Sequence, residues 1–271
     1  MTTHITFIGG GNMASAIIGG LLRQGLRADQ LSVVEPFAPA RDKLLAQFGI
    51  QALAAADARL APSTLVVWAV KPQTFRDAAA AVRPHTPAAL HLSVAAGIRS
   101  DSIAHWLGTE RIVRSMPNTP ALVGKGMTAL FARAAATADD RTTVENVMAS
   151  TGEVLWVQQE SQLDAVTAIS GSGPAYVFYF IEAMTEAGLG MGLSREQAHR
   201  LAVGTFVGAS ELARVAQDPP EILRERVTSK GGTTFAAISA MEQDGLKARF
   251  VRAIQAAEVR ARELGDEFGK G

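Results

Sequence analysis

The stretch HITFIGGGNMASA, residues 4–16, passes from an apolar segment through three glycines into small and apolar residues with helical spacing. Its first half is short, apolar and partly β-branched, which predicts a strand. Gly9, Gly11 and Ala14 then form the spacing G-x-G-x-x-A, which is typical of a dinucleotide-binding turn. Gly9 permits the tight turn, Gly11 lets the backbone approach a pyrophosphate, and Ala14 lets the helix close on the strand. The stretch therefore predicts a dinucleotide site at the first strand–helix turn, with an ordinary tight turn as the simpler alternative.

Residues after this turn and at the end of the second expected strand indicate how the cofactor binds and whether it is NAD or NADP. Asn12 and Met13 lie at the start of the helix expected from residue 13, so their N–H groups and the positive end of the helix dipole are offered to the phosphates. Glu35 ends the second expected strand, where an acidic residue bonds the ribose hydroxyls and favours NAD. Arg41 lies close by in sequence and can reach a 2′-phosphate, so both NAD and NADP stay open. The simpler reading of Glu35 is a solvated residue before a proline.

The first part of the chain alternates between apolar strands and amphipathic helices, which predicts βαβ units and a parallel sheet with helices on both faces. This pattern makes residues 1–160 a Rossmann-type dinucleotide-binding domain of the α/β class. We expect strands at residues 4–9, 31–36, 64–70, 90–96, 111–117, 127–132 and 153–158, and helices at 13–24, 38–48, 75–82, 100–107 and 139–150.

Three loops follow the third, fourth and fifth expected strands. In open α/β sheets ligands bind outside the carboxyl ends of the strands, so these loops are candidates for cofactor contact. Each one carries small, polar or proline-fixed residues, although loops of this kind also simply end strands. The candidates are Val70, Lys71 and Pro72, then Ala95 and Gly97, then Pro117, Asn118 and Thr119.

The character of the chain changes after about residue 159, because no convincing strand remains. Helices are expected at residues 174–187, 194–216, from about 220, from 233 or 234 to about 245, and at 246–264. Ser194 and Gln197 have the spacing of a capping box at the start of the second of these. Small residues on the helix faces allow close packing. Residues 161–271 are therefore expected to form an all-helical domain.

The composition of the chain excludes several kinds of binding partner and catalytic chemistry. Lysine plus arginine equals aspartate plus glutamate at 26 each, so no net charge attracts nucleic acid or an anionic membrane. The absence of cysteine excludes disulfides and thiolate chemistry and suits a reducing, cytoplasmic setting. The five histidines are scattered, so no metal site is expected. The sequence has neither a recognisable signal peptide nor an apolar run long enough to span a membrane.

The stretch VTSKGGTTFAAI, residues 227–238, gathers hydroxyls and glycines immediately before an apolar helix. Backbone N–H groups at Gly231, Gly232 and Thr233, with the Ser229 hydroxyl, can cradle a carboxylate at such a helix start. A glycine turn followed by a threonine N-cap would look the same locally.

Taken in order, FIGGGNMASAIIGGL, AVKPQ, VAAGI, RSMPNTPALVGKGMTAL, ISGSGPAYVFYFIEAM and VTSKGGTT resemble pyrroline-5-carboxylate reductase over essentially the whole chain. The departures are Lys230, where many members have proline, and Arg226, where many have asparagine. The resemblance implies NAD(P)H-dependent hydride transfer to the C=N carbon of 1-pyrroline-5-carboxylate, giving L-proline in the last step of its biosynthesis. It also implies that Thr234 hydrogen-bonds the ring nitrogen and that Ser229, Gly231, Gly232 and Thr233 bind the carboxylate.

The resemblance further implies that residues 170–176, SGSGPAY, line the active site, that the helical domain forms a homodimer, and that decamers are possible. Three other functions compete with this reading. A β-hydroxyacid dehydrogenase would carry a lysine on the first long helix of its second domain, and this chain has no lysine between Lys125 and Lys230. A cofactor sensor without turnover, and an enzyme for a six-membered cyclic imine, stay open.

Overall fold

The structure, a computed structural model, describes residues 4–269. The chain forms two compact units. One holds the chain up to Ser172 and again from Ala257 onward, and the other holds Gly173–Ala256. The expected division after residue 160 stays a prediction, because a domain defined by sequence and a compact unit need not share a boundary.

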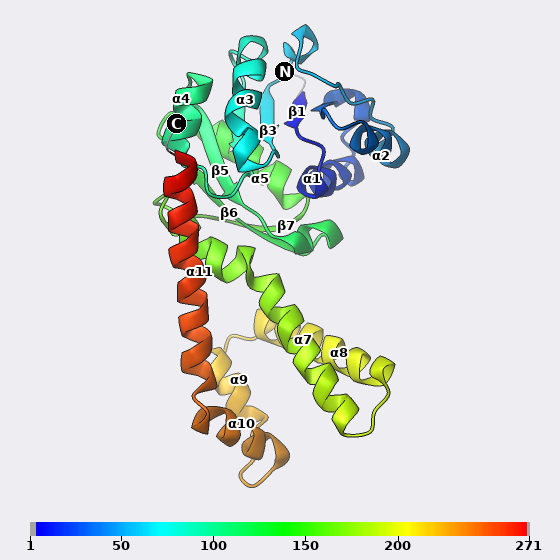
Figure 1. The fold of residues 1–271 in the computed structure, drawn as a ribbon, viewed down its shortest axis with the longest axis vertical. Coiled ribbons are helices and arrows are strands. Elements are labelled where there is room, and N and C mark those ends of the chain that lie inside the picture. The colour runs from blue at the N-terminus through cyan, green and yellow to red at the C-terminus, as the bar shows by residue number, and fades with distance from the viewer. Residues whose placement is uncertain (1–3, 270–271) are drawn as a thin grey trace. The chain divides into compact units, whose positions relative to one another are not determined.

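The first unit is built on a seven-stranded sheet with the order β2-β1-β3-β4-β5-β6-β7 (Figure 1). Every strand expected from the sequence is present. The chain runs outward from β1 to β2 and then returns past β1 to β3, so the strand order reverses between β1 and β3. The strands are β1 Ile5–Ile8, β2 Leu31–Val34, β3 Leu65–Trp68, β4 Leu90–Ser93, β5 Ile112–Met116, β6 Gly126–Ala132 and β7 Gly152–Trp156.

The sheet is not wholly parallel, which corrects the prediction. β6 runs antiparallel to β5, with Val113 opposite Ala132, whereas the other neighbouring strands pair in parallel. The reason is the link between β5 and β6, which contains only the 3₁₀ turn η4 at Thr119–Val123. A parallel neighbour needs a crossover of a dozen or more residues, and this link is too short to supply one.

Helices cover both faces of the sheet, as expected. They begin and end close to the predicted residues, except that α3 starts earlier, with Pro72 at a first-turn position where proline is well tolerated. The short helix α6 and the π-helical segment after it were not predicted. The helices of this unit are α1 Asn12–Arg23, α2 Ala38–Phe48, α3 Pro72–Val82, α4 Ser100–Leu107, α5 Ala138–Ala149, α6 Gln162–Val166 and the π-helical segment Thr167–Gly171.

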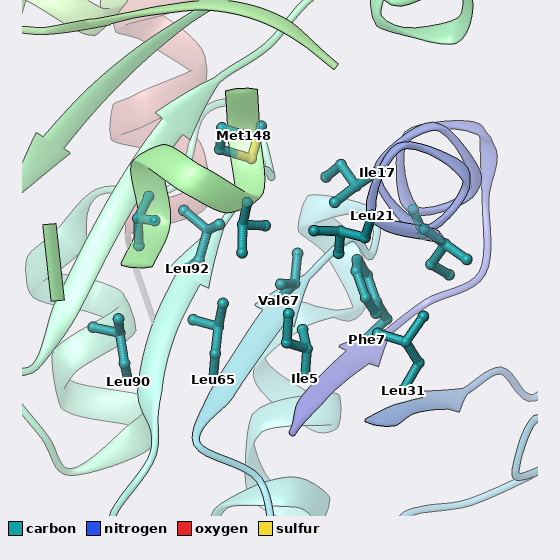
Figure 2. Close-up of a cluster of buried hydrophobic side chains, with 14 of the residues drawn as sticks. Ile5, Phe7, Ile17, Leu21, Leu31, Leu65, Val67, Leu90, Leu92 and Met148 are labelled. Atoms are coloured by element: carbon teal, nitrogen blue, oxygen red, sulfur yellow. The ribbon is translucent and has the colours of Figure 1, made fainter. Parts of the chain in front are cut away.

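Alternation along the strands divides the core into two clusters. Strand residues such as Phe7, Val67 and Leu92 point toward one face, where they meet Ile17 and Met148 from covering helices (Figure 2). Residues one position along each strand point to the other face and meet different helices. Trp68 lies there, stacked on Phe75 with ring centroids 4.7 Å apart. Burial on both faces explains why the parallel strands are almost continuously apolar.

The second unit consists of helices, as expected: α7 Gly173–Gly190, α8 Arg195–Val215, α9 Pro220–Arg226, α10 Thr233–Gln243 and the first part of α11 Leu246–Gly269. The capping box before α8 is formed, since Ser194 accepts from the Gln197 N–H and the Gln197 side chain accepts from the Ser194 N–H. α7 and α8 pack closely, because a Cβ at Gly188 would lie 2.6 Å from the Ala198 Cβ.

The last helix, α11, runs beyond its expected end at residue 264. Its final residues belong to the first unit, where Phe268 packs against the second core cluster. A Cβ at Gly97 would lie 3.1 Å from the Phe268 ring. Tertiary packing therefore extends the helix past the point where its sequence pattern weakens. No helix among residues 4–269 is both long and apolar enough to cross a membrane.

Candidate functional site

The turn after β1 has the strained geometry that its glycines suggested. Gly9 has a φ of 95°, and its N–H donates to the Val34 carbonyl at 2.8 Å. A Cβ at this residue would lie 2.5 Å from the Ala69 carbonyl oxygen. The turn is thus held between the ends of β2 and β3, at the point where the strand order reverses. Ligands of open α/β sheets bind at such a point.

Gly11 differs from Gly9, because nothing in the protein requires it. Its φ is −72°, and a Cβ built on it would meet no atom within 4 Å. The first helical hydrogen bond of α1 runs from the Ser15 N–H to the Gly11 carbonyl, so the N–H groups of Asn12, Met13 and Ala14 precede it. Open space over a helix N-terminus fits the pyrophosphate of a dinucleotide.

Glu35 and Arg41 are both held by backbone groups at the end of β2. The two carboxylate oxygens of Glu35 accept hydrogen bonds from the Gly10 and Phe37 N–H groups, each at 2.8 Å. The Arg41 guanidinium donates to the carbonyls of Glu35 and Pro36 at 3.0 and 2.6 Å. Both side chains lie close to the fingerprint turn, and the acidic one is already engaged in fixing it.

The loops after β3 and β4 lie at the same edge of the sheet. Lys71 is the exposed N-cap of α3, with Val70 before it and Pro72 after it. Ala95 is buried, and its N–H donates to the Ser93 hydroxyl at 3.3 Å. Gly97 has a φ of 75° and packs against α11, so its lack of a side chain serves packing in this structure.

The loop after β5 carries Pro117, Asn118 and Thr119, of which Pro117 is buried and Thr119 exposed. The Asn118 side chain is fully engaged within the protein. Its Oδ1 accepts from the Met127 N–H at 2.9 Å, and its Nδ2 donates to the carbonyl and the hydroxyl of Ser170, both at 3.2 Å. A ligand therefore meets the backbone of this residue rather than its amide.

A partly buried ionic cluster supports this edge of the sheet, and nothing in the sequence pattern pointed to it. Glu160 accepts from the Ser100 N–H at 2.6 Å and from its hydroxyl at 2.7 Å, which caps α4, and it also pairs with the buried Arg114. Burial by itself would raise the pKa of Glu160, but the Arg114 charge and the Ser100 hydrogen bonds outweigh it and lower that pKa. Arg99 and Asp164 form a second pair beside it at 2.8 Å.

The second unit contains the hydroxyl-rich turn. Gly231 has a φ of 76°, and the Gly232 N–H donates to the Ser229 carbonyl at 3.0 Å, which takes that N–H out of the expected carboxylate cradle. A Cβ at Gly232 would lie 2.8 Å from the Ser229 hydroxyl oxygen. The first helical bond of α10 comes from the Ala236 N–H, so the N–H groups of Thr233 and Thr234 precede it.

The two residues that depart from the family pattern are exposed. Arg226 pairs with Asp218 at 2.6 Å, and Lys230 is an exposed side chain in the turn. Thr234 is half-buried in the first turn of α10, and Ser229 is exposed.

Among residues 4–269, no three His, Asp or Glu side chains gather in a way that could hold a metal ion.

Comparison with known proteins gives two family models. Residues 160–264 match the model for pyrroline-5-carboxylate reductase dimerisation, and residues 4–97 match a model for NADP oxidoreductases that depend on coenzyme F420. Among curated proteins, pyrroline-5-carboxylate reductase from Pseudomonas aeruginosa is 42% identical over 271 residues, covering 99% of both chains.

Solved structures agree with this. A pyrroline-5-carboxylate reductase from Coxiella burnetii superposes with a TM-score of 0.89 at 37% identity, covering 97% of this chain and 99% of the other. The Plasmodium falciparum pyrroline carboxylate reductase with NADP bound gives 0.87 at 28% identity, covering 97% and 98%. With the fingerprint turn and the glycine–threonine helix start both present, these full-length likenesses show that the chain belongs to the pyrroline-5-carboxylate reductase family.

Proposed function

We propose that this protein reduces 1-pyrroline-5-carboxylate to L-proline with NADPH or NADH, as the last step of proline biosynthesis. The observation that carries the proposal is the full-length likeness of this chain, with its two glycine-rich helix starts, to these reductases. The reaction needs a site for a reduced dinucleotide and a site for a small cyclic imine that bears a carboxylate. The described residues supply candidates for each.

The cofactor site consists of the α1 N-terminus and the loops after β1, β3, β4 and β5. The N–H groups of Asn12, Met13 and Ala14 bind the pyrophosphate, and the space over Gly11 admits it. When bound, the reduced nicotinamide supplies the hydride to the C=N carbon. The backbone of the Val70–Pro72, Ala95–Gly97 and Pro117–Thr119 loops borders the nicotinamide end.

Glu35 and Arg41 make the site tolerant of both cofactors. Because two backbone N–H groups already neutralise part of the Glu35 charge, this carboxylate repels a 2′-phosphate less than a free one would. The Arg41 guanidinium lies beside it and keeps further N–H donors for a phosphate. We therefore expect NADPH to be used, with NADH as an accepted alternative.

The substrate carboxylate binds at the start of α10. The N–H groups of Gly231 and Thr233 and the hydroxyl of Ser229 face an anion favourably at this helix N-terminus, while Gly232 shapes the turn. The Thr234 hydroxyl orients the ring nitrogen. It also assists protonation of that nitrogen, with water as the proton source. Backbone N–H dipoles suit this role because they stabilise the carboxylate without placing a charged side chain beside the imine.

The helical unit forms a homodimer, which is the minimal unit of any larger assembly such as a decamer. Support comes from the match to a dimerisation model and from apolar side chains on α7 and α8 that are exposed in the single chain. Phe178, Tyr179, Leu201 and Val207 are each about 60–70% exposed. A second copy covers them, since exposed apolar patches of this kind mark interfaces.

The lack of cysteine further supports a cytoplasmic location.

Alternative functions are less well supported. A β-hydroxyacid dehydrogenase would need a lysine on the first long helix of its second domain. This chain has no lysine between Lys125 and Lys230. A sensor that binds the cofactor without turnover would not need the hydroxyls at Ser229 and Thr234. A six-membered cyclic imine carries the same functional groups as the proposed substrate and must be tested directly.

The decisive experiment is to follow NADPH, and then NADH, by nicotinamide absorbance with pyrroline-5-carboxylate and with the six-membered piperideine carboxylate. We expect loss of absorbance and formation of proline, faster with the five-membered ring. Faster turnover of the larger ring would reassign the substrate. Cofactor binding without consumption of either imine would overturn the proposed activity.

A further inference from the structure

The π-helical segment just before α7 contains a backbone carbonyl whose helical partner is missing. In a regular helix the Ser170 carbonyl accepts from the N–H four residues later, but that residue is Pro174, which has no N–H. The chain is π-helical over Thr167–Gly171, with the Ser172 N–H donating to the Thr167 carbonyl at 2.8 Å. The helix is therefore widened at this point, and Pro174 removes one of its donors.

Asn118 supplies the missing donor from a distant part of the chain. Its Nδ2 lies 3.2 Å from the Ser170 carbonyl oxygen and 3.2 Å from the Ser170 hydroxyl. Its Oδ1 accepts from the Met127 N–H at 2.9 Å, which fixes the orientation of the amide, since only an oxygen can face that donor. A single side chain thus joins the end of β5, the start of β6 and the π-helical segment.

The π-helical segment also packs directly on the end of β5. A Cβ at Gly171 would lie 2.4 Å from the Met116 methyl group, and Met116 is the last residue of that strand. The carboxyl end of β5 belongs to the edge of the sheet where dinucleotide folds bind their ligands. π-helical segments are frequent at functional sites. The segment is therefore held against this edge by one polar and one apolar contact.

We propose that Asn118 is a positioning residue for the reduction: its side chain contacts neither cofactor nor substrate but holds Thr167–Gly171 against the end of β5. In doing so it sets the surface that borders the nicotinamide end of the cofactor site. This inference rests on the proposed function. It reassigns the Asn118 amide from the cofactor contact expected from sequence to a contact within the protein.

The first test compares Asn118→Ala with the matched control Asn146→Ala, which changes an exposed asparagine on α5. We expect Asn118→Ala to lower kcat by roughly tenfold or more, because small displacements of positioning groups are costly. The Kd for NADPH, measured by titration, should stay within about twofold, since the backbone contacts to the cofactor remain. An unchanged kcat, or an equal loss of cofactor binding, would overturn the positioning role.

The second test is a rescue. Pro174→Ala restores an N–H that can donate to the Ser170 carbonyl, so the double variant should recover part of the kcat lost in Asn118→Ala. Hydrogen–deuterium exchange of residues 167–172 reports on the same contact without any substrate. We expect exchange to be roughly fivefold faster in Asn118→Ala, as for the loss of one hydrogen bond, and slower again in the double variant.

These two readouts separate the inference from the proposed function. Unchanged exchange in Asn118→Ala, or a double variant that recovers neither kcat nor protection, would refute the positioning role even in an active enzyme. A wild-type protein that consumes no imine but shows the exchange pattern would instead overturn the proposed activity. In that case the contact would hold the segment without a role in this reaction.

Discussion

His91 should make the stability of this protein depend on pH in a way that one substitution removes. The side chain lies on β4, is 2% exposed, and accepts a hydrogen bond at Nδ1 from the Trp68 indole N–H at 3.1 Å. Burial, helped by the charge of nearby Arg111, lowers the pKa of His91 from 6.5 to about 4. Protonation of Nδ1 would also break this hydrogen bond, because two N–H groups would then face each other. The folded protein therefore holds this imidazole neutral.

The direction and size of the effect follow from the two pKa values. The stabilisation is fully present above pH 6.5, where the unfolded chain is also neutral, and is lost as pH falls toward 4. Linkage between a pKa of 6.5 unfolded and about 4 folded gives a loss of about 2 kcal/mol between pH 7 and pH 5. A loss of this size is a substantial part of the stability of an ordinary domain.

The assay is urea unfolding at pH 7, 6 and 5, at one protein concentration because subunit association contributes to stability. His91→Gln keeps an acceptor for Trp68 but cannot take up the proton. Between pH 7 and pH 5, the unfolding free energy of the wild type should fall by about 2 kcal/mol more than that of this variant. Other titrating groups, including the ion pair of Arg111 and Asp140, act equally in both proteins. Parallel curves, or a wild type that is no more sensitive than the variant, would refute the argument.

Two further predictions concern the active site. Gly11→Val should fold normally, because a Cβ there would meet no protein atom within 4 Å, yet it should bind NADPH at least roughly a hundredfold more weakly. Gly9→Val is the contrast, since its φ of 95° and the Ala69 carbonyl forbid a side chain, and it should lower the melting temperature. Normal NADPH titration of Gly11→Val would remove the fingerprint from the cofactor site. Thr234→Ala should reduce turnover roughly ten- to a thousandfold in steady-state assays while cofactor binding persists. Wild-type turnover would exclude the Thr234 hydroxyl from the mechanism.

Much of the fold follows from local sequence alone. Buried parallel strands are apolar along their whole length, so β1 to β5 stand out in the sequence. The fingerprint needs only the spacing of Gly9, Gly11 and Ala14 within one strand–turn–helix unit, and its geometry is as expected. The box of Ser194 and Gln197 is equally local, and it caps α8 as predicted. Such features depend on residues a few positions apart, which a sequence displays directly.

Other features depend on residues that meet only after folding. The pairing of β6 with β5 joins strands that lie side by side only in the folded sheet, and the final turns of α11 depend on packing around Phe268. Glu160 caps a helix that begins 60 residues earlier. Asn118 satisfies a carbonyl 52 residues later, which the sequence shows only as a proline in a glycine-rich stretch. The sequence by itself determined the strands, most of the helices and the two glycine-rich helix starts, because each follows from local periodicity and turn chemistry. Only the tertiary structure decided which distant side chains complete them, because hydrogen bonds and close packing require atoms to meet in space.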